Sequence, residues 1–262
     1  MRTEGAPGSV PPRVAALVAG AASGLGAASA RLLHASGFHV VAVDLDGNGV
    51  EELAAGLGKG ATAVRADISN GEDVAAAIAA VPSDLPLRAV VVCAGVGHVE
   101  RIIGREAAHS AAGFRRTIEI NLIGSFNLLT QGAMAIGSTS PDRDGERGAI
   151  VLTSSVAAFD GQIGQIAYSA SKAAVAGMVL PAARDLAASG IRVCAIAPGT
   201  FETPLLAGLP QRAREGLAAQ VPFPKRLGDP PEFAALVQHV LQNKMLNGEV
   251  IRLDGALRMP PS

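Results

Sequence analysis

The chain has 262 residues, of which 49% are hydrophobic and 17% charged, and its formal net charge is −1. This length and composition are typical of a globular, enzyme-sized protein, and a near-neutral charge without a basic block argues against nucleic acid as a partner. The longest apolar runs are too short or too interrupted to span a bilayer, so we expect a soluble protein without a membrane partner.

The N-terminal residues 1–12 are rich in Gly and Pro and contain no apolar segment of the kind found in secretory signals. We interpret them as a flexible tail and take the cytoplasm as the default location.

Seven short β-rich runs alternate with Ala-rich amphipathic stretches. The expected strands are Val14–Val18, His39–Val43, Ala61–Ala66, Ala89–Cys93, Ala149–Thr153, Arg192–Ile196 and Val250–Leu253. Helical patterns fill most of the gaps, which indicates an α/β fold, a doubly wound domain with a seven-stranded parallel sheet.

No linker or internal repeat divides the chain, so residues 1–262 are expected to form a single domain. Residues 200–229, between the sixth strand and the last helix, are rich in proline and mixed charges and are predicted to be a substrate lid.

The first strand leads directly into a glycine-rich run, Gly20-Ala-Ala-Ser-Gly-Leu-Gly26, and a helix is expected from Ala27 to Ser36. Glycines permit a tight turn there, and N–H groups at the helix N-terminus can approach a pyrophosphate. Asp44 ends the second strand, where a carboxylate would bind the adenosine ribose and repel a 2′-phosphate. The pattern predicts a Rossmann-type domain that prefers NAD to NADP. The alternatives are a plain glycine turn and a turn or capping role for Asp44.

The chain has a single tyrosine, Tyr168, four residues before Lys172. On a helix, residues four apart share a face, so the ammonium would lower the pKa of the phenol. Such a pair is a candidate general acid or base. Taken alone, the spacing favours the other interpretation, a tyrosine packed at a helix surface with a solvated lysine nearby, so the choice rests on the other motifs of the chain.

Cysteine and histidine usage gives no sign of a metal. Cys93 and Cys194 lie in apolar strand-like runs, which fits free thiols in a reducing compartment. The histidines show no ligand spacing with one another or with the cysteines, so no metal site is expected. They are at positions 34, 39, 98, 109 and 239.

The order of the motifs, Gly-x-x-x-Gly-x-Gly and far downstream Tyr-x-x-x-Lys, resembles the short-chain dehydrogenase/reductase family over nearly the whole chain. The resemblance implies a catalytic group of Asn121, Ser155, Tyr168 and Lys172. It also implies a set of cofactor contacts: Gly20, Ser23, Gly24, Leu25, Gly26, Asp44, Asp67, Ile68, Cys93, Ala94, Gly95, Tyr168, Lys172, Pro198, Gly199, Phe201 and Thr203.

Within that family, residues 155–168, 197–206, 221–230 and 247–255 look like the 3-hydroxyacyl-CoA dehydrogenases, in which a cysteine at position 93 is expected. The resemblance implies NAD-dependent interconversion of a short or branched 3-hydroxyacyl-CoA, or a hydroxysteroid, and its keto form. The alternatives are a 3-ketoacyl-ACP reductase or another short-chain alcohol dehydrogenase, and, from a different class, a non-catalytic dinucleotide-binding scaffold.

The resemblance also suggests substrate contacts and an assembly. Substrate contacts are expected at Ser155, Gln165, Tyr168, Leu205 and Leu206. Residues 96–114 are shorter than in animal relatives, so the substrate range transfers less securely than the reaction type. Family members commonly form tetramers through the helices that contain Asn121 and Tyr168, so a homotetramer is expected.

The lid segment offers two further groups of side chains. An apolar group would face an acyl or steroid body: Phe201, Leu205, Leu206 and Leu209. A basic group would meet CoA phosphates or simply be solvated: Arg212, Arg214, Lys225 and Arg226.

Overall fold

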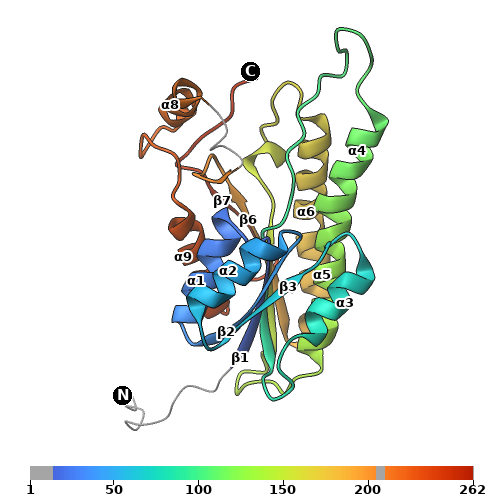
Figure 1. The fold of residues 1–262 in the computed structure, drawn as a ribbon, viewed down its shortest axis with the longest axis vertical. Coiled ribbons are helices and arrows are strands. Elements are labelled where there is room, and N and C mark those ends of the chain that lie inside the picture. Colours follow the sequence, from blue (N-terminus) through green and yellow to red (C-terminus); the bar gives the residue numbers. More distant parts are fainter. Residues whose placement is uncertain (1–13, 205–209, 262) are drawn as a thin grey trace.

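The computed structural model describes residues 14–204 and 210–261 (Figure 1). All seven expected strands are present, and every neighbouring pair is parallel. They are β1 (Val14–Ala19), β2 (Phe38–Asp44), β3 (Ala61–Arg65), β4 (Leu87–Val92), β5 (Gly148–Thr153), β6 (Ile191–Pro198) and β7 (Val250–Leu253). The prediction of a doubly wound α/β fold is therefore confirmed.

The strand order is β3-β2-β1-β4-β5-β6-β7, so the direction of winding reverses between β1 and β4. In doubly wound sheets, ligands bind beyond the carboxyl ends of the strands at such a switch point. The glycine run after β1 and the segment after β4 both begin there.

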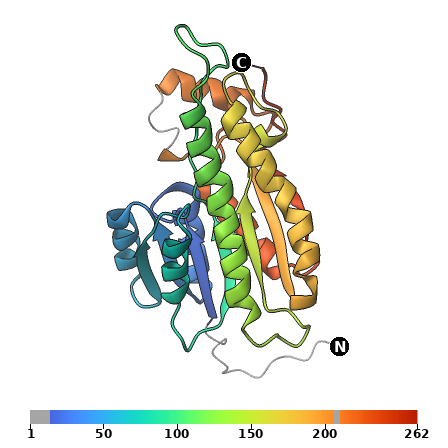
Figure 2. The same cartoon turned by 90° about the vertical axis from the view of Figure 1, so that its right-hand side faces the viewer.

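Helices cover both faces of the sheet (Figures 1 and 2). They are α1 (Gly24–Ala35), α2 (Gly47–Leu57), α3 (Gly71–Ala79), α4 (Ala111–Ile118), α5 (Gly124–Gly137), α6 (Ile166–Asp185), α8 (Gln211–Gln220) and α9 (Pro230–Gln242). A π-helical turn, η1 (Glu119–Ile123), joins α4 to α5, and the three form one rod beside α6 in Figure 2.

Strand alternation divides the hydrophobic core into two layers. Leu17 belongs to the layer that includes residues of α3, α5 and α6, while its neighbour Val18 belongs to the layer under α1, α2 and α9. Both are fully buried. The near-continuous hydrophobic strands of the sequence follow from this burial on both faces.

The structure corrects one local expectation from the sequence. The first helix begins at Gly24, three residues before Ala27, because Ser23 already occupies the N-cap position in extended conformation. Helix α6 contains Pro181 and continues past it to Asp185, so this proline does not end the helix.

Among the described helices, α6 alone is long and apolar enough, by length and composition, to cross a membrane. It packs against β6 and α4 through buried residues that include Ala167, Val175 and Val179. Part of the apolar character of α6 is therefore explained by its packing in the protein core.

The two ends of the 200–229 segment are tied together. Thr200 O accepts a hydrogen bond from Gly228 N at 2.9 Å, and Gly228 O accepts one from Glu202 N at 2.8 Å. The segment therefore leaves and rejoins the body at one place, with α8 between (Figure 1). Leu205, Leu206 and Leu209 lie outside the described residues.

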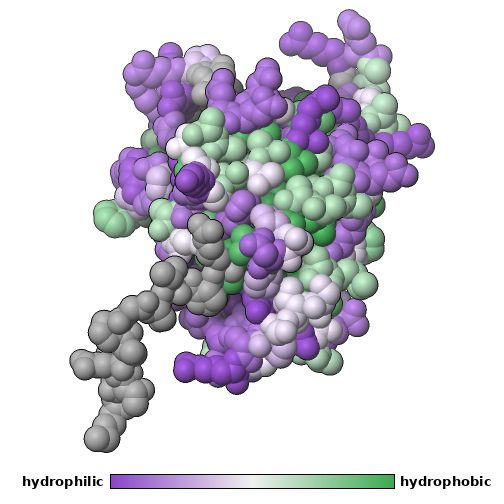
Figure 3. Space-filling model, turned by 60° about the horizontal axis from the view of Figure 1, so that its bottom comes forward, coloured by the Kyte–Doolittle hydropathy of each residue, from purple (hydrophilic) through white to green (hydrophobic). Residues whose placement is uncertain are grey.

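The molecular surface is uneven in hydropathy. In the space-filling view, hydrophilic residues predominate at the margin and more hydrophobic ones lie toward the middle (Figure 3). Hydrophilic residues are therefore not spread evenly over this face.

Candidate active site

Tyr168 and Lys172 lie one turn apart on α6, as their spacing predicted. Lys172 Nζ is 5.9 Å from the centre of the Tyr168 ring and donates a hydrogen bond to the backbone oxygen of Thr153, the last residue of β5, at 2.8 Å. Lys172 is only 4% exposed, and this burial lowers its pKa to about 8. Its ammonium is thus close to deprotonation at slightly alkaline pH.

The pKa of Tyr168 differs from the expectation. Burial raises the pKa of the phenol, and a hydrogen bond with Ser155 acts in the opposite direction without cancelling it. The expected lowering by Lys172 is therefore not found in the protein alone, because desolvation is the largest effect at this position.

Ser154 and Ser155 point in different directions, as expected at the end of a strand. Ser154 Oγ donates a hydrogen bond to the Lys172 backbone oxygen at 2.8 Å, so its hydroxyl is committed to α6. Ser155 Oγ accepts one from Ala157 N at 3.1 Å and also contacts Tyr168. Of the two serines, Ser155 is the one placed against the phenol.

Asn121 lies in the π-helical turn η1 and is fully buried. Its side chain holds both backbone groups of Val96: Val96 N donates to Oδ1 at 2.8 Å, and Nδ2 donates to Val96 O at 2.9 Å. Nδ2 also donates to Ser171 Oγ at 3.0 Å. Asn121 thus connects the segment after β4 to α6. Its side chain projects from the π-helical turn between α4 and α5.

Gly95 lies between these groups. A Cβ at this position would be 3.0 Å from Asn121 Oδ1 and 3.4 Å from Lys172 Nζ. A side chain here would press on both residues, so the position suits glycine. The four residues predicted as catalytic therefore converge on one end of the sheet, beside the segment after β4.

The glycine run forms the close-packed turn that a dinucleotide site requires. A Cβ on Gly26 would be 1.9 Å from Gly20 O, and a Cβ on Gly20, whose φ is +81°, would be 2.5 Å from Ala94 N. Only glycine fits at these two positions. The turn opens directly into the N-terminus of α1, where backbone N–H groups favour an anion. These residues fit a bound dinucleotide.

One acidic residue borders this turn, and a second expected contact follows β3. Asp44 accepts hydrogen bonds from Ala22 N and Asp46 N, both at 3.1 Å, which fixes its carboxylate beside the glycine run. Asp67 Oδ1 accepts hydrogen bonds from Ser69 N and Ser69 Oγ, and these lower the pKa of Asp67. Helix α3, which follows Ser69, is capped by Asn70.

Other expected cofactor contacts surround the same end of the sheet. A Cβ on Gly24 would be 3.3 Å from Thr203 Cγ2, so these two residues face each other. Pro198 ends β6, and Gly199 packs against Asp254. Ile68 is buried against Gly124, while Leu25 and Cys93 pack against the core layer under α1.

The thiol of Cys93 is expected to be unreactive. Burial raises its pKa to about 11, so it stays protonated at physiological pH. Cys93 and Cys194 are both free in the structure.

The structure corrects the expectation for Phe201. Its side chain is 6% exposed and makes an edge contact with Phe233, with ring centres 6.4 Å apart. It belongs to the core and cannot line an acyl surface. Gln165 lies at the N-cap of α6, where its Oε1 accepts a hydrogen bond from Gln162 N.

Two of the basic lid residues have acidic partners. Arg226 makes a two-pronged ion pair with Glu232, at 2.7 and 2.8 Å, and Arg214 pairs with Glu202. Because acidic partners already neutralise these two arginines, they are poorly suited to bind CoA phosphates.

Sequence reasoning missed one group of side chains. The histidines show no ligand spacing in the sequence, yet His98 and His109 both contact Glu100 in the structure. Their sequence spacing, on opposite arms of a loop, gave no such signal.

Comparison with known proteins agrees with this geometry. The family model for short chain dehydrogenase matches residues 14–214. The chain belongs to this family, and it is an oxidoreductase.

Individual relatives cover almost the full length. The chain is 49% identical to 3-hydroxyacyl-CoA dehydrogenase type-2 of Bos taurus, over 94% of this chain and 95% of that protein. It is also 49% identical to the protein of that name from Drosophila melanogaster, over 94% and 97%.

Two solved structures are similar. That of 3-hydroxyacyl-CoA dehydrogenase type-2 from Mycobacterium avium has a TM-score of 0.91 and 45% identity, covering 95% of this chain and 97% of that one. That of 3-ketoacyl-(acyl-carrier-protein) reductase from Brucella melitensis, complexed with NADH, has a TM-score of 0.82 and 28% identity, covering 94% and 98%.

Proposed function

We propose that this protein is an NAD-dependent oxidoreductase that interconverts a 3-hydroxyacyl-CoA and its 3-keto form. The main support is the placement of Tyr168 one turn from buried Lys172, with Ser155 hydrogen-bonded to the phenol. The substrate class is supported by near-full-length relatives at 46–49% identity that are named for this activity. The reductase from Brucella melitensis is the runner-up model, at 28% identity.

In the oxidative direction, the Tyr168 phenolate accepts the proton of the substrate hydroxyl. Ser155 donates a hydrogen bond to the substrate oxygen and keeps it beside the phenol. Lys172 stabilises the phenolate through its positive charge. Asn121 holds Val96, and with it the segment that adjoins Lys172. NAD, when bound, supplies the acceptor for the hydride that leaves the carbinol carbon.

NAD would be held by the glycine turn and by Asp44. The turn presents backbone N–H groups of the N-terminus of α1 to the pyrophosphate. Asp44, fixed by Ala22 N and Asp46 N, provides a carboxylate for ribose hydroxyls. A 2′-phosphate would meet this negative charge, which supports NAD over NADP.

A homotetramer belongs to the same proposal. Large hydrophobic side chains are exposed on α5 and α6, among them Phe126, Met134, Ile166 and Leu180. Exposed apolar side chains on neighbouring helices are typical of a subunit contact.

The function is tested by following NADH formation with purified protein, NAD and a short 3-hydroxyacyl-CoA, beside Tyr168→Phe and beside NADP. We expect turnover with NAD and weaker turnover with NADP. Tyr168→Phe keeps the ring and removes the proton acceptor, so kcat should fall by about 100-fold or more.

Calorimetric NAD binding to the same Tyr168→Phe protein is the control, since loss of the hydroxyl should leave the glycine turn intact. Retained binding with lost turnover supports the assigned role. Turnover with a 3-ketoacyl carrier-protein substrate and NADPH, but none with the CoA ester, would favour the reductase instead.

A further inference from the structure

The segment between β4 and α4 forms a small hairpin that projects from the body (Figure 1). Its arms pair through an antiparallel bridge between Ile103 and Ala108, and His109 N donates a hydrogen bond to Ile102 O at 3.0 Å. One arm contains His98 and Glu100, and His109 is on the other. All three lie where the hairpin joins the body.

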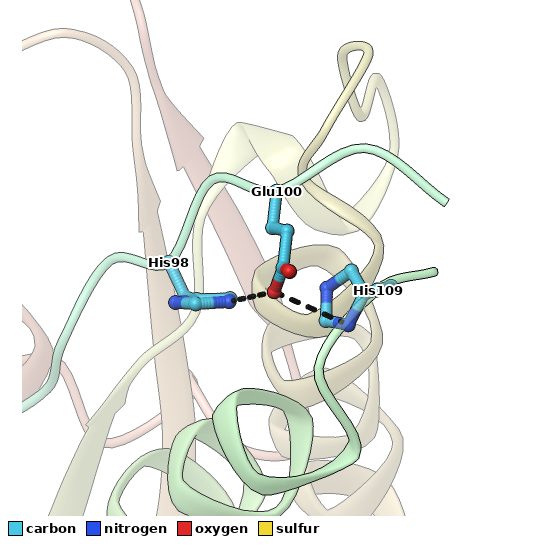
Figure 4. A group of neighbouring side chains, drawn as sticks. All are labelled: His98, Glu100 and His109. Atoms are coloured by element: carbon cyan, nitrogen blue, oxygen red, sulfur yellow. Dashed lines mark hydrogen bonds and ion pairs between the residues drawn. The ribbon is translucent and has the colours of Figure 1, made fainter. Parts of the chain in front are cut away.

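Their side chains point toward one another (Figure 4). His98 Nε2 is 2.9 Å from Glu100 Oε2, and His109 Nδ1 is 3.6 Å from the same oxygen. One potential ligand atom from each residue lies within 4.8 Å of the other two. A zinc ion between these residues would lie about 2.0–2.2 Å from each ligand atom, which requires the His109 ring to turn its Nε2 toward the ion.

His109 has an unused ring nitrogen. Its Nδ1 is 3.1 Å from Ser110 O, a carbonyl that can only accept, so Nδ1 bears the proton in the neutral ring. Nε2 then carries the free lone pair and is the nitrogen that would bind an ion, and it is buried without a hydrogen-bond partner among the described residues. An imidazole whose other nitrogen donates to a backbone carbonyl has the usual arrangement of a metal ligand.

We propose that His98, Glu100 and His109 form a site for Zn²⁺ or a similar transition-metal ion. Two imidazoles and one carboxylate are a ligand set typical of zinc, whereas Mg²⁺ and Ca²⁺ prefer oxygen ligands alone. Three protein ligands leave a position for water.

A bound ion would brace the entrance to the active site. Glu100 N donates a hydrogen bond to Gly164 O at 2.9 Å, in the loop that leads into α6 and Tyr168. Cross-linking the two arms at their base would therefore fix the hairpin against this loop.

The site is tested first by binding. Metal-free protein without a histidine tag is titrated with Zn²⁺ by calorimetry and with Co²⁺ by visible absorption. We expect one ion per chain. Glu100→Gln and His98→Gln should weaken binding by more than about tenfold, since each removes a ligand. His239→Gln, an exposed histidine of α9, is the matched control and should bind normally.

Tryptic cleavage provides a second readout that does not depend on activity. Arg101 and Arg105 are exposed in the hairpin, and Arg143 is an exposed site in a distant loop. Zn²⁺ should slow cleavage at Arg101 and Arg105 and leave Arg143 unchanged, and Glu100→Gln should abolish the difference. The proposal is overturned if Zn²⁺ does not bind, if both variants bind as well as the wild type, or if protection is equal at all three sites.

Discussion

Lys172 is a cationic side chain that the fold buries almost completely, and this burial makes stability depend on pH. In the folded protein its pKa is lowered to about 8, from an ordinary value of 10.5. Between these values the unfolded chain binds more protons than the folded one, so the free energy of unfolding rises with pH through this group.

We therefore compare wild type with Lys172→Met, which keeps a similar length without charge. Between pH 8 and pH 9 the stability of the wild type should rise relative to the variant by about 1 kcal/mol. Urea unfolding at both pH values measures the difference, and other titrating groups cancel because both proteins have them. Lys59→Met, at an exposed lysine, is the control. A wild-type advantage that stays constant with pH would contradict the lowered pKa.

The residues of the site show what a sequence can and cannot reveal. Tyr168 and Lys172 were found because a helix converts a spacing of four into proximity. The direction of the Tyr168 pKa shift was wrong, since it depends on desolvation, which no spacing encodes. The group around Glu100 was missed for a related reason. Two arms of an irregular loop bring its members together, and no periodic element sets their separation.

At the scale of elements, the strands were predictable and the helix ends less so. Strands buried on both faces are continuous apolar runs, and all seven were found within a few residues of their bounds. The start of α1 was misplaced because glycines 24 and 26 are poor helix formers, yet Ser23 already occupies the N-cap position before them. The predicted role of Phe201 in the apolar lid surface was wrong, because its side chain packs against α9, a tertiary contact that the local sequence does not reveal.

The turn between β1 and α1 leads to a prediction about this pair of elements. Gly26→Ala would place a methyl group 1.9 Å from Gly20 O, so the turn must open. We expect a loss of about 1–3 kcal/mol in unfolding free energy. NAD binding should weaken by at least about tenfold, because the N–H groups of the turn lose their arrangement.

Thermal unfolding and calorimetric titration with NAD measure these two effects. Gly56→Ala in α2 is the matched control, because a Cβ there has no neighbour closer than 4.0 Å. It should leave NAD affinity unchanged and be neutral or stabilising by up to about 1 kcal/mol. Equal behaviour of the two variants would mean that the turn tolerates the methyl group.

At the scale of the whole molecule, the exposed apolar residues of α5 and α6 bear on assembly. Met134 on α5 is 78% exposed, and Met245, after α9, is 91% exposed. The two are chemically identical, but only Met134 is on the helices proposed as the subunit contact. Met134→Glu would put a charge into a desolvated contact and should dissociate the tetramer, whereas Met245→Glu should not.

Light scattering coupled to size-exclusion chromatography distinguishes these outcomes. The wild type and Met245→Glu should elute with the mass of four chains, and Met134→Glu with that of a smaller species. The apolar outer face of α6 would then be explained by burial between subunits, since the same helix orients Tyr168 and Lys172 from its inner face. A monomeric wild type would overturn the assembly proposal, and a tetramer unaffected by Met134→Glu would place the contact on another face.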